Sequence, residues 1–210
     1  MDLDAAIRAR RMCRDFSPEP VDPAIIDRLV DWARRAPSAG HTQGRAWVVL
    51  EGPDTAAFWS AGSEDPQRAA GVARAPVIVL ALVSPAAYTA RYSQPDKASR
   101  QWQRADSWPV PYWWVDGGGA VATLLLGAVE EGLGALFFAL HGPARPLLDR
   151  FGVPAEWEAL GAIALGWPAS GGPASGEPAS GGPARHGASV ARGRPPLPSV
   201  IHRGRWRPRT

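Results

Sequence analysis

The chain has 210 residues, of which 45% are hydrophobic and 20% are charged, a composition typical of a soluble protein with one full-sized core. Its formal net charge is only +3, so nucleic acid is not an expected partner. The longest apolar run, around residues 120–129, is shorter than the about 20 residues that a membrane span needs, and no membrane association is expected.

Arginine supplies nearly all of the positive charge, since Lys97 is the sole lysine. A guanidinium can hold a phosphate or carboxylate through two parallel hydrogen bonds, so this bias favours anionic ligands, although a GC-rich genome would produce the same bias. Cys13 is the only cysteine, which excludes an intramolecular disulfide and fits a reducing cytoplasm. Residues 1–14 are charged throughout and lack the apolar core of a secretory signal, so we expect a cytoplasmic protein.

The chain opens with two predicted helices. Residues 2–11 are expected to form a short helix, and the proline-rich residues 17–21 to break the chain. A second helix begins at Asp22-Pro23, because aspartate is a good N-cap and proline suits the first turn of a helix. It ends before Pro37, which disfavours helical geometry in the residue that precedes it.

Two strands and an irregular region are expected next. After a loop at 38–45, residues 46–50 are predicted to form a strand. Residues 76–83 are an unbroken apolar run, which is typical of a buried strand. Residues 84–114 show no regular pattern, and their rings either pack a core or stack on a planar ligand. The aromatic residues of this region are Tyr88, Tyr92, Trp102, Trp108, Tyr112, Trp113 and Trp114.

A long helix is predicted over about residues 112–132. Its middle, 117–127, is almost entirely small or aliphatic, so the helix should be buried on most sides. Strands are expected at 135–140 and 159–166, with a helix at 143–151 between them.

Low-complexity sequence follows. Residues 168–187 repeat PASGG, PASGE, PASGG and PARHG, with no large apolar side chain to offset the entropy lost on ordering. We therefore divide the chain into a domain at 1–167, a flexible linker at 168–194 and a C-terminal arm at 195–210. Apolar residues should dock this arm at a specific place, such as a partner subunit. They are Leu197, Val200, Ile201 and Trp206.

Three motifs are candidates for ligand contact. Arg10, Arg11 and Arg14 stand within five residues near the end of the first predicted helix. Such a cluster would hold a phosphate, but a solvated basic helix end has the same sequence. Cys13 lies among these arginines, which would lower the pKa of its thiol.

The second motif is RAPSAGHTQ at 35–43, whose small residues let backbone amides approach a flat ligand, as an ordinary connecting loop also would. The third is the tail HRGRW at 202–206, where Arg203 and Arg205 either meet a phosphate or bind nothing. The histidines are scattered without the spacing of metal ligands, so no metal site is expected.

Together and in this order, the motifs resemble those of FMN-dependent nitroreductase-family proteins. The stretch ARRMCRDFSPEPVDPAIIDRLVDWARRAPSAGHTQGRAWVVLEG is similar to the N-terminal half of that family. DGGGAVATLLLGAVEEGLGALFF resembles its central dimer helix, and ALGAIALGWP and VIHRGRW resemble its last strands and C-terminal arm. The resemblance implies an α+β nitroreductase-like fold with a mainly antiparallel central sheet flanked by helices. It also implies a homodimer with FMN at the subunit interface and a domain-swapped C-terminal arm.

The resemblance further implies which residues contact the cofactor. The arginines of the first motif and of the tail would hold the phosphate, the 35–43 motif would contact the flavin from the other subunit, and two phenylalanines would lie against the isoalloxazine ring. These positions are Arg10, Arg11, Met12, Arg14, Pro37, Ser38, Ala39, His41, Gln43, Phe137, Phe138, Arg203 and Arg205.

Several residues depart from the family pattern. Met12 replaces a common serine, His41 a usual asparagine, and Gly44-Arg45 the usual Pro-Trp. Phe137 and its neighbour stand where a polar or glycine-bearing turn is common. The change at Met12 would remove one side-chain hydrogen bond, and the change at Phe137 and Phe138 would alter the flavin potential or substrate access.

The implied activity is that of an FMN-dependent oxidoreductase. NADH or NADPH would give a hydride to the flavin, which would pass it or electrons to a nitroaromatic, a quinone or a similar small planar acceptor, in ping-pong fashion. Because flavin N5 carries the chemistry, no catalytic side chain is expected. Trp108, Tyr112 and Trp113 are the candidates for the acceptor side. The alternatives are a specialised flavin-dependent dehydrogenase or oxidase of biosynthesis, flavin cleavage, and a non-enzymatic flavin-binding protein.

Overall fold

The computed structural model describes residues 1–61, 70–169 and 193–206. The chain divides into two units, Met1–Glu177 and Pro178–Thr210, and each is described by itself. From residue 170 onward, the predicted low-complexity repeat and nearly all of the predicted linker lie outside the described residues.

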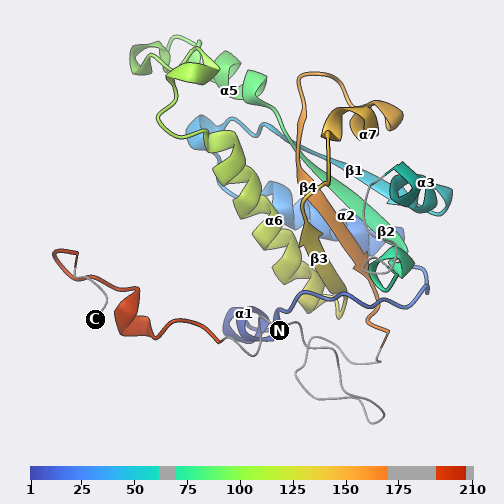
Figure 1. The fold of residues 1–210 in the computed structure, drawn as a ribbon. Coiled ribbons are helices and arrows are strands. Elements are labelled where there is room, and N and C mark those ends of the chain that lie inside the picture. The colour runs from blue at the N-terminus through green and yellow to red at the C-terminus, as the bar shows by residue number, and fades with distance from the viewer. Residues whose placement is uncertain (62–69, 170–192, 207–210) are drawn as a thin grey trace. The chain divides into compact units, whose positions relative to one another are not determined.

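A four-stranded antiparallel sheet forms the centre of the first unit, in the order β1-β2-β4-β3 (Figure 1). Its strands are β1 (Arg45–Glu51), β2 (Val77–Val83), β3 (Gly134–Phe138) and β4 (Glu158–Gly166). β1 and β2 pair along their whole length, and the β2–β4 ladder shifts register once, between Ala81 and Leu82. The expected antiparallel α+β architecture is confirmed.

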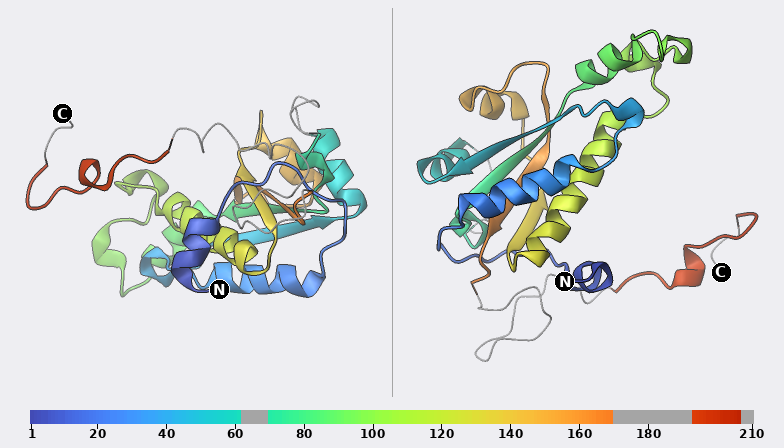
Figure 2. Two further views of the ribbon diagram at one scale, coloured as in Figure 1. Left: turned by 90° about the horizontal axis from the view of Figure 1, so that it is seen from below. Right: turned by 180° about the vertical axis from the view of Figure 1, so that it is seen from behind.

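Helices cover both faces of this sheet. Successive side chains of a strand point to opposite faces, and every residue of β2 is buried. The odd-numbered residues of β2 pack with α2 (Pro23–Arg34) and α6 (Tyr112–Glu130), and the even-numbered ones with α3 (Pro53–Ala61) and α7 (Ala144–Arg150). The left view of Figure 2 shows α2 on one side of the sheet and α3 on the other. The apolar run thus forms a strand between two helical layers.

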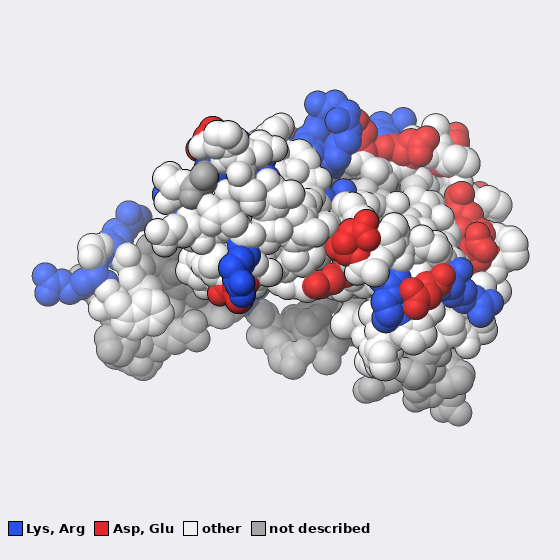
Figure 3. All heavy atoms as spheres, turned by 90° about the horizontal axis from the view of Figure 1, so that it is seen from above, with Lys and Arg blue, Asp and Glu red and all other residues white. Residues whose placement is uncertain are grey.

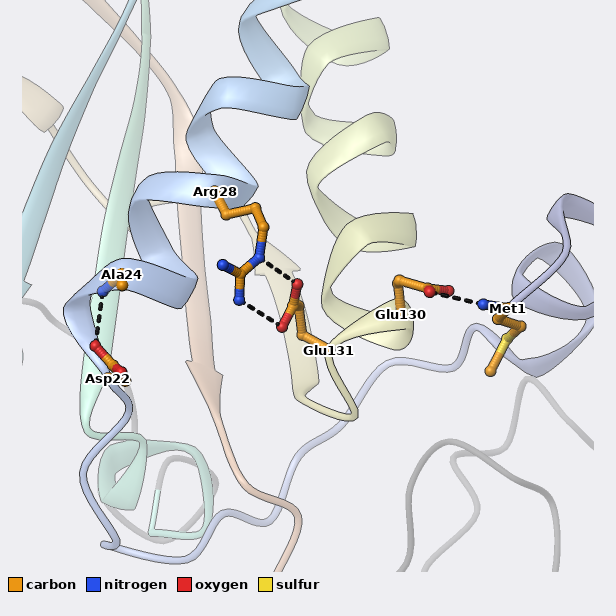
Figure 4. Close-up of polar contacts among 6 residues, drawn as sticks. All are labelled: Met1, Asp22, Ala24, Arg28, Glu130 and Glu131. Atoms are coloured by element: carbon orange, nitrogen blue, oxygen red, sulfur yellow. Dashed lines mark hydrogen bonds and ion pairs between the residues drawn. The ribbon is translucent and has the colours of Figure 1, made fainter.

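α2 and α6 are fastened to each other at one end. The Arg28 guanidinium meets Glu131 through two hydrogen bonds, Nε to Oε1 at 2.6 Å and Nη2 to Oε2 at 3.0 Å (Figure 4). Gly127 lets the helices approach closely, because a Cβ there would lie 2.7 Å from the Trp32 ring and 2.9 Å from Leu29. The predicted N-cap Asp22 accepts a hydrogen bond from the Ala24 N–H at 2.9 Å.

α1 (Leu3–Ala9) is shorter than the helix predicted over 2–11. Arg10 leaves the helix with φ −53° and ψ 119°, so the basic residues continue as an extended segment. The terminal ammonium of Met1 lies 2.6 Å from Glu130 Oε1 (Figure 4). This ion pair places α1 at the end of α6.

Two of the described helices lie where no regular element is predicted. α3 buries only Phe58 and has no amphipathic pattern. α5 (Pro85–Tyr92) begins within the region expected to be irregular, and the Ser84 side chain caps it by accepting from the Ala87 N–H. Short 3₁₀ turns are also present. They are η1 (Ala39–His41), η2 (Val72–Arg74), η3 (Ala98–Arg100), η4 (Ala105–Ser107) and η5 (Leu197–Ser199).

Across residues 1–61, 70–169 and 193–206, no helix combines the length and the apolar character needed to cross a membrane. Within the same ranges, no group of three or more His, Cys, Asp or Glu side chains is placed to hold a metal ion.

The described part of the second unit, 193–206, contains η5 and a turn. The rings of His202 and Trp206 stack with their centroids 4.0 Å apart. Trp206 is nevertheless 74% exposed, and Leu197, Val200 and Ile201 are also exposed. Within this unit the apolar side chains of the arm therefore remain accessible.

Candidate functional site

Residues 10–16, called the basic segment below, are held against the edge strand β3. Met12 forms a parallel bridge with Ala135, and the Cys13 N–H donates to the Ala135 carbonyl at 2.9 Å. Gly134 makes this approach possible, because a Cβ there would lie 2.7 Å from Cys13 Sγ. Phe16, fully buried, anchors the far end of the segment. The backbone around the three arginines is therefore fixed.

Within the described residues these arginines have no acidic partners, unlike most of the other arginines that the structure describes. In the described parts of the chain, the side chains of Arg10, Arg11 and Arg14 form no ion pair with a carboxylate; Arg11 and Arg14 donate only to backbone carbonyls. Nη1 of Arg10 is buried without any hydrogen-bond partner. A buried donor without an acceptor is destabilising, and an anion at this position would satisfy it. The arginines that do pair with Asp or Glu are Arg8, Arg28, Arg34, Arg35, Arg74, Arg91, Arg104 and Arg145.

The charged surface reflects this pairing. On the face in Figure 3, basic and acidic groups lie side by side in several places, with broad uncharged areas between them. The arginine content of the chain therefore does not form a continuous basic surface on that face.

The pKa of the Cys13 thiol is raised, opposite to the lowering that its arginine neighbours suggest. Burial raises the pKa of its thiol above the ordinary value of 9.0 and outweighs the lowering by the Asp15 carbonyl, the next largest effect. The Cys13 thiol donates to that carbonyl at 3.2 Å. The charge of Arg14 also lowers the pKa, but it is the smallest of the four effects, and desolvation of the thiolate dominates.

The second motif forms a tight loop after α2. Gly40, His41 and Gln43 have φ angles of 61°, 55° and 57°, and such left-handed geometry costs a non-glycine residue about 1–2 kcal/mol. The Ser38 hydroxyl accepts from the Gln43 N–H at 3.0 Å, and Gln43 Nε2 lies 3.4 Å from His41 Nδ1. The loop brings together four of the predicted positions, Ser38, Ala39, His41 and Gln43.

Side chains from three elements hold this loop in place. Asp116 Oδ2 accepts from the Ala39 N–H at 2.7 Å, and Arg91 Nε donates to the Gly40 carbonyl at 2.9 Å. Arg45 Nη2 donates to the Ala36 carbonyl at 2.8 Å, and its Nη1 reaches the carbonyl of Pro37 at 3.4 Å. Arg45, a departure from the family pattern, thus fastens the loop.

The aromatic region forms a packed cluster beside the loop. Trp108 and Trp113 are only 7% and 6% exposed, and Trp108 lies 4.6 Å from Tyr92 between ring centroids. Burial raises the pKa of Tyr88, and a hydrogen bond to Asp116 raises it further. Core packing is therefore what the structure shows for Trp108 and Trp113, whereas Tyr112 is half-buried.

Phe137 and Phe138 lie on opposite faces of the sheet. Phe137 packs with the layer of α2 and α6, and Phe138 packs on the other face. There the Phe138 ring stacks on Trp59 at 5.8 Å with an interplanar angle of 8°, beside a cavity of about 60 Å³. The two rings therefore do not form one surface.

The basic segment and the 37–43 loop lie at opposite ends of α6. The loop is bonded to Asp116 near the start of the helix, whereas α1 meets Glu130 at its end. At 1.5 Å per residue, this stretch of helix spans about 21 Å. Figure 2 shows η1 and α1 at these two ends. One chain does not bring the two motifs together, and Arg203 and Arg205 belong to the second unit.

Asp116 is a residue that motif reasoning missed. It is the only charged residue between Tyr112 and Val129, and a lone half-buried carboxylate in an apolar helix requires polar partners. That isolation is the signal that could have identified it.

Comparison with known proteins reveals relatives in sequence and in structure. The family model described as Nitroreductase family matches residues 7–167. A 4-nitrobenzoate reductase from Pseudomonas putida is 41% identical over 51 residues, which are 24% of this chain and 22% of that protein. The match therefore spans about a fifth of the length of that relative.

Three solved structures share the fold. Nitroreductase CinD from Lactococcus lactis, in complex with nicotinic acid, has a TM-score of 0.68 at 16% identity, over 80% of this chain and 90% of that one. A Desulfovibrio desulfuricans protein assigned to the nitroreductases, in complex with FMN, has a TM-score of 0.66 at 22% identity, over 99% of each chain. A nitroreductase family protein from Clostridium novyi has a TM-score of 0.63 at 20% identity, over 80% of this chain and 86% of that one. They confirm the nitroreductase-like fold, and with the family model covering most of its length this chain belongs to the nitroreductase family.

Proposed function

We propose that this chain binds FMN and acts as an oxidoreductase, passing reducing equivalents from cytoplasmic NADH or NADPH to a nitroaromatic, a quinone or a similar planar acceptor. The observation that carries the proposal is the basic segment, in which three guanidinium groups lack a carboxylate partner among the described residues and Arg10 Nη1 is buried without an acceptor. The phosphate of FMN carries close to two negative charges and three acceptor oxygens, which fits this set of donors.

The remaining contacts follow from the family pattern. Arg10, Arg11 and Arg14 would hold the phosphate, the 37–43 loop would meet the ring, and the Phe137–Phe138 segment would lie beside it. When bound, FMN supplies the hydride chemistry, and the protein supplies position and charge. The FMN complex of the D. desulfuricans protein supports this choice of cofactor.

We further propose that a second copy of the chain completes the site. The exposed side of α6 is apolar, with Val115 52% exposed, Ala122 exposed and no charged residue from 117 to 129. Gly118 and Gly119 face open space. Mid-helix glycine destabilises a helix by about 0.5–1 kcal/mol relative to alanine, so two of them on an apolar face suit close approach by a partner.

A partner related by twofold symmetry would bring its own 37–43 loop to the basic segment of this chain. The C-terminal arm would cross in the same way and deliver Arg203 and Arg205 to the phosphate. Its exposed apolar residues, such as Trp206 and Ile201, fit an arm that docks on another subunit.

Two measurements test these proposals. The purified protein should show flavin absorbance that bleaches with NADH or NADPH and returns with a nitroaromatic; a flavin that stays oxidised with both nucleotides would refute the activity. Ala122→Arg should give a folded monomer in light scattering with little bound FMN, whereas Ala56→Arg, at an exposed position of α3, should remain dimeric. A dimeric Ala122→Arg protein with full flavin content would refute the interface.

A further inference from the structure

We infer that Asp116 is a positioning residue of the flavin site, and that its carboxylate fixes the 37–43 loop in the conformation that meets the cofactor. The inference rests on the proposed function, in which this loop contacts the flavin. It adds a residue outside the motifs that identify the site.

One oxygen of Asp116 joins two parts of the molecule. Oδ2 accepts from the Ala39 N–H at 2.7 Å and from the Tyr88 hydroxyl at 2.7 Å. The backbone carbonyl of Asp116 lies 3.4 Å from Arg45 Nη1. Ala39 belongs to the loop and Asp116 to α6, so the bond between them ties the loop to the helix.

The loop requires such an anchor because its own geometry is unfavourable. His41 and Gln43 are non-glycine residues with positive φ, and residues in such geometry persist only where their surroundings hold them. Close packing also sets the depth of the loop, since a Cβ at Gly40 would lie 2.8 Å from Tyr92 and one at Gly44 would lie 2.8 Å from Tyr88. Packing limits inward movement, whereas the bond to Asp116 opposes outward movement.

Asp116 does not stabilise α6 itself. It lies beyond the first turn, so it does not cap the helix, and aspartate is a weak helix former. It makes no ion pair with a described basic residue. Among the described residues, the Asp116 side chain accepts hydrogen bonds from Ala39 and from Tyr88, and the first of these assigns it to the loop.

The substitutions at this position separate acceptor geometry from charge. Both bonds end on a single oxygen, so Asp116→Asn retains an atom that can accept both, whereas Asp116→Ala removes it. Tyr88→Phe leaves the bond to Ala39 in place. Ala39→Pro removes the donor and leaves α6 unchanged, which tests the same contact should Asp116→Ala fail to fold. Asp54→Ala, on the exposed first turn of α3, is the matched control.

FMN affinity and the visible circular dichroism of the bound flavin should be measured for each full-length variant. We expect Asp116→Ala and Ala39→Pro each to weaken FMN binding at least tenfold and to alter the flavin spectrum. Asp116→Asn should recover most of the affinity. Tyr88→Phe should lose less affinity than Asp116→Ala, because the bond to Ala39 remains, and Asp54→Ala should bind as the wild type does. Combining Asp116→Ala with Ala39→Pro should add little further loss, because both remove one contact.

The outcomes distinguish this inference from the proposed function. A wild-type protein that binds no FMN would refute the proposed function itself. If the wild type binds FMN, unchanged affinity and spectrum in a folded Asp116→Ala or Ala39→Pro protein would overturn the role of Asp116. An Asp116→Asn protein no better than Asp116→Ala would overturn the hydrogen bond as its basis.

Discussion

Replacing Gly134 with alanine would place a methyl group where Cys13 already lies. The added Cβ would be 2.7 Å from Cys13 Sγ, 2.8 Å from its Cβ and 3.3 Å from the ring of Phe16. Overpacking of this kind costs about 1–3 kcal/mol, and the gain from replacing a strand glycine offsets about 0.5–1 kcal/mol. At the middle of both ranges the net loss is about 1 kcal/mol, or a fall in melting temperature of about 2–4 °C for a chain of this size.

The substitution should also weaken FMN binding. Cys13 can yield only by drawing its segment away from Ala135, which moves Arg10 and Arg14 on either side of it. Urea unfolding of the flavin-free protein, followed by tryptophan fluorescence, measures stability without the contribution of bound ligand. FMN titration of the same protein measures the effect on the site.

Cys13→Gly provides the matched test, because it removes both atoms that the new methyl group would strike. In a double-mutant cycle, Gly134→Ala should be substantially less destabilising with glycine at position 13, giving a coupling energy of about 0.5–3 kcal/mol. The same loss in both backgrounds, or no loss with cysteine present, would refute the reasoning that this contact sets the position of the segment.

Three further predictions follow from individual side chains. Arg10→Ala should weaken FMN binding about ten- to hundredfold, since a charge-assisted hydrogen bond contributes about 1.5–3 kcal/mol; Arg8→Ala, whose guanidinium is already paired with an aspartate, should bind normally in a fluorescence titration. The hydrogen bond from Arg28 lowers the pKa of Glu131 in the folded protein below its ordinary value of 4.5. The ion pair therefore stabilises the fold at neutral pH, and this stabilisation should be lost as the pH falls from 4.5 through the lowered pKa of the folded protein. Acidification should therefore reduce the melting temperature of Arg28→Ala less than that of the wild type, and parallel curves would contradict this assignment. Because burial raises the pKa of the Cys13 thiol, iodoacetamide at about pH 8 should modify the native protein much more slowly than the unfolded one; equal rates would show that the thiol is accessible and ionised.

Elements that depend on local pattern were predicted closely from the sequence. The strand expected at 76–83 is β2, and the one expected at 159–166 is β4 with one more residue at its start. An unbroken apolar run and an Asp-Pro helix start act through neighbouring residues, so short windows of sequence contain the information. α3 has no such pattern, because only Phe58 is buried.

Contacts between distant segments were not predictable in this way. The first helix was expected to continue to residue 11, but the pairing of Met12 with Ala135 draws the chain into an extended conformation. No local feature of either segment indicates that partner. The same pairing partly buries Cys13, and its pKa shifts in the direction opposite to the one its arginine neighbours suggest.

The candidate site shows a similar division. Resemblance to a family pointed to the basic segment and the loop and assigned the loop to the other subunit's flavin, but it did not place the two at opposite ends of α6. The opposite orientations of Phe137 and Phe138 follow from the alternation of side chains along a strand, and could have been predicted once β3 was assigned. The aromatic pattern around Trp108 could not distinguish packing from stacking on a ligand, because both require large flat side chains.

The separation of the two motifs along α6 has a genetic consequence. In the proposed dimer, each cofactor would draw its arginines from one subunit and its loop from the other. An Arg10→Ala chain and an Asp116→Ala chain would then carry defects in different halves of the site. In a mixed dimer, one site would hold both defects and the other none, so re-association of the two variants should restore about a quarter of all sites. Two alleles, each deficient alone, would complement each other within a single protein.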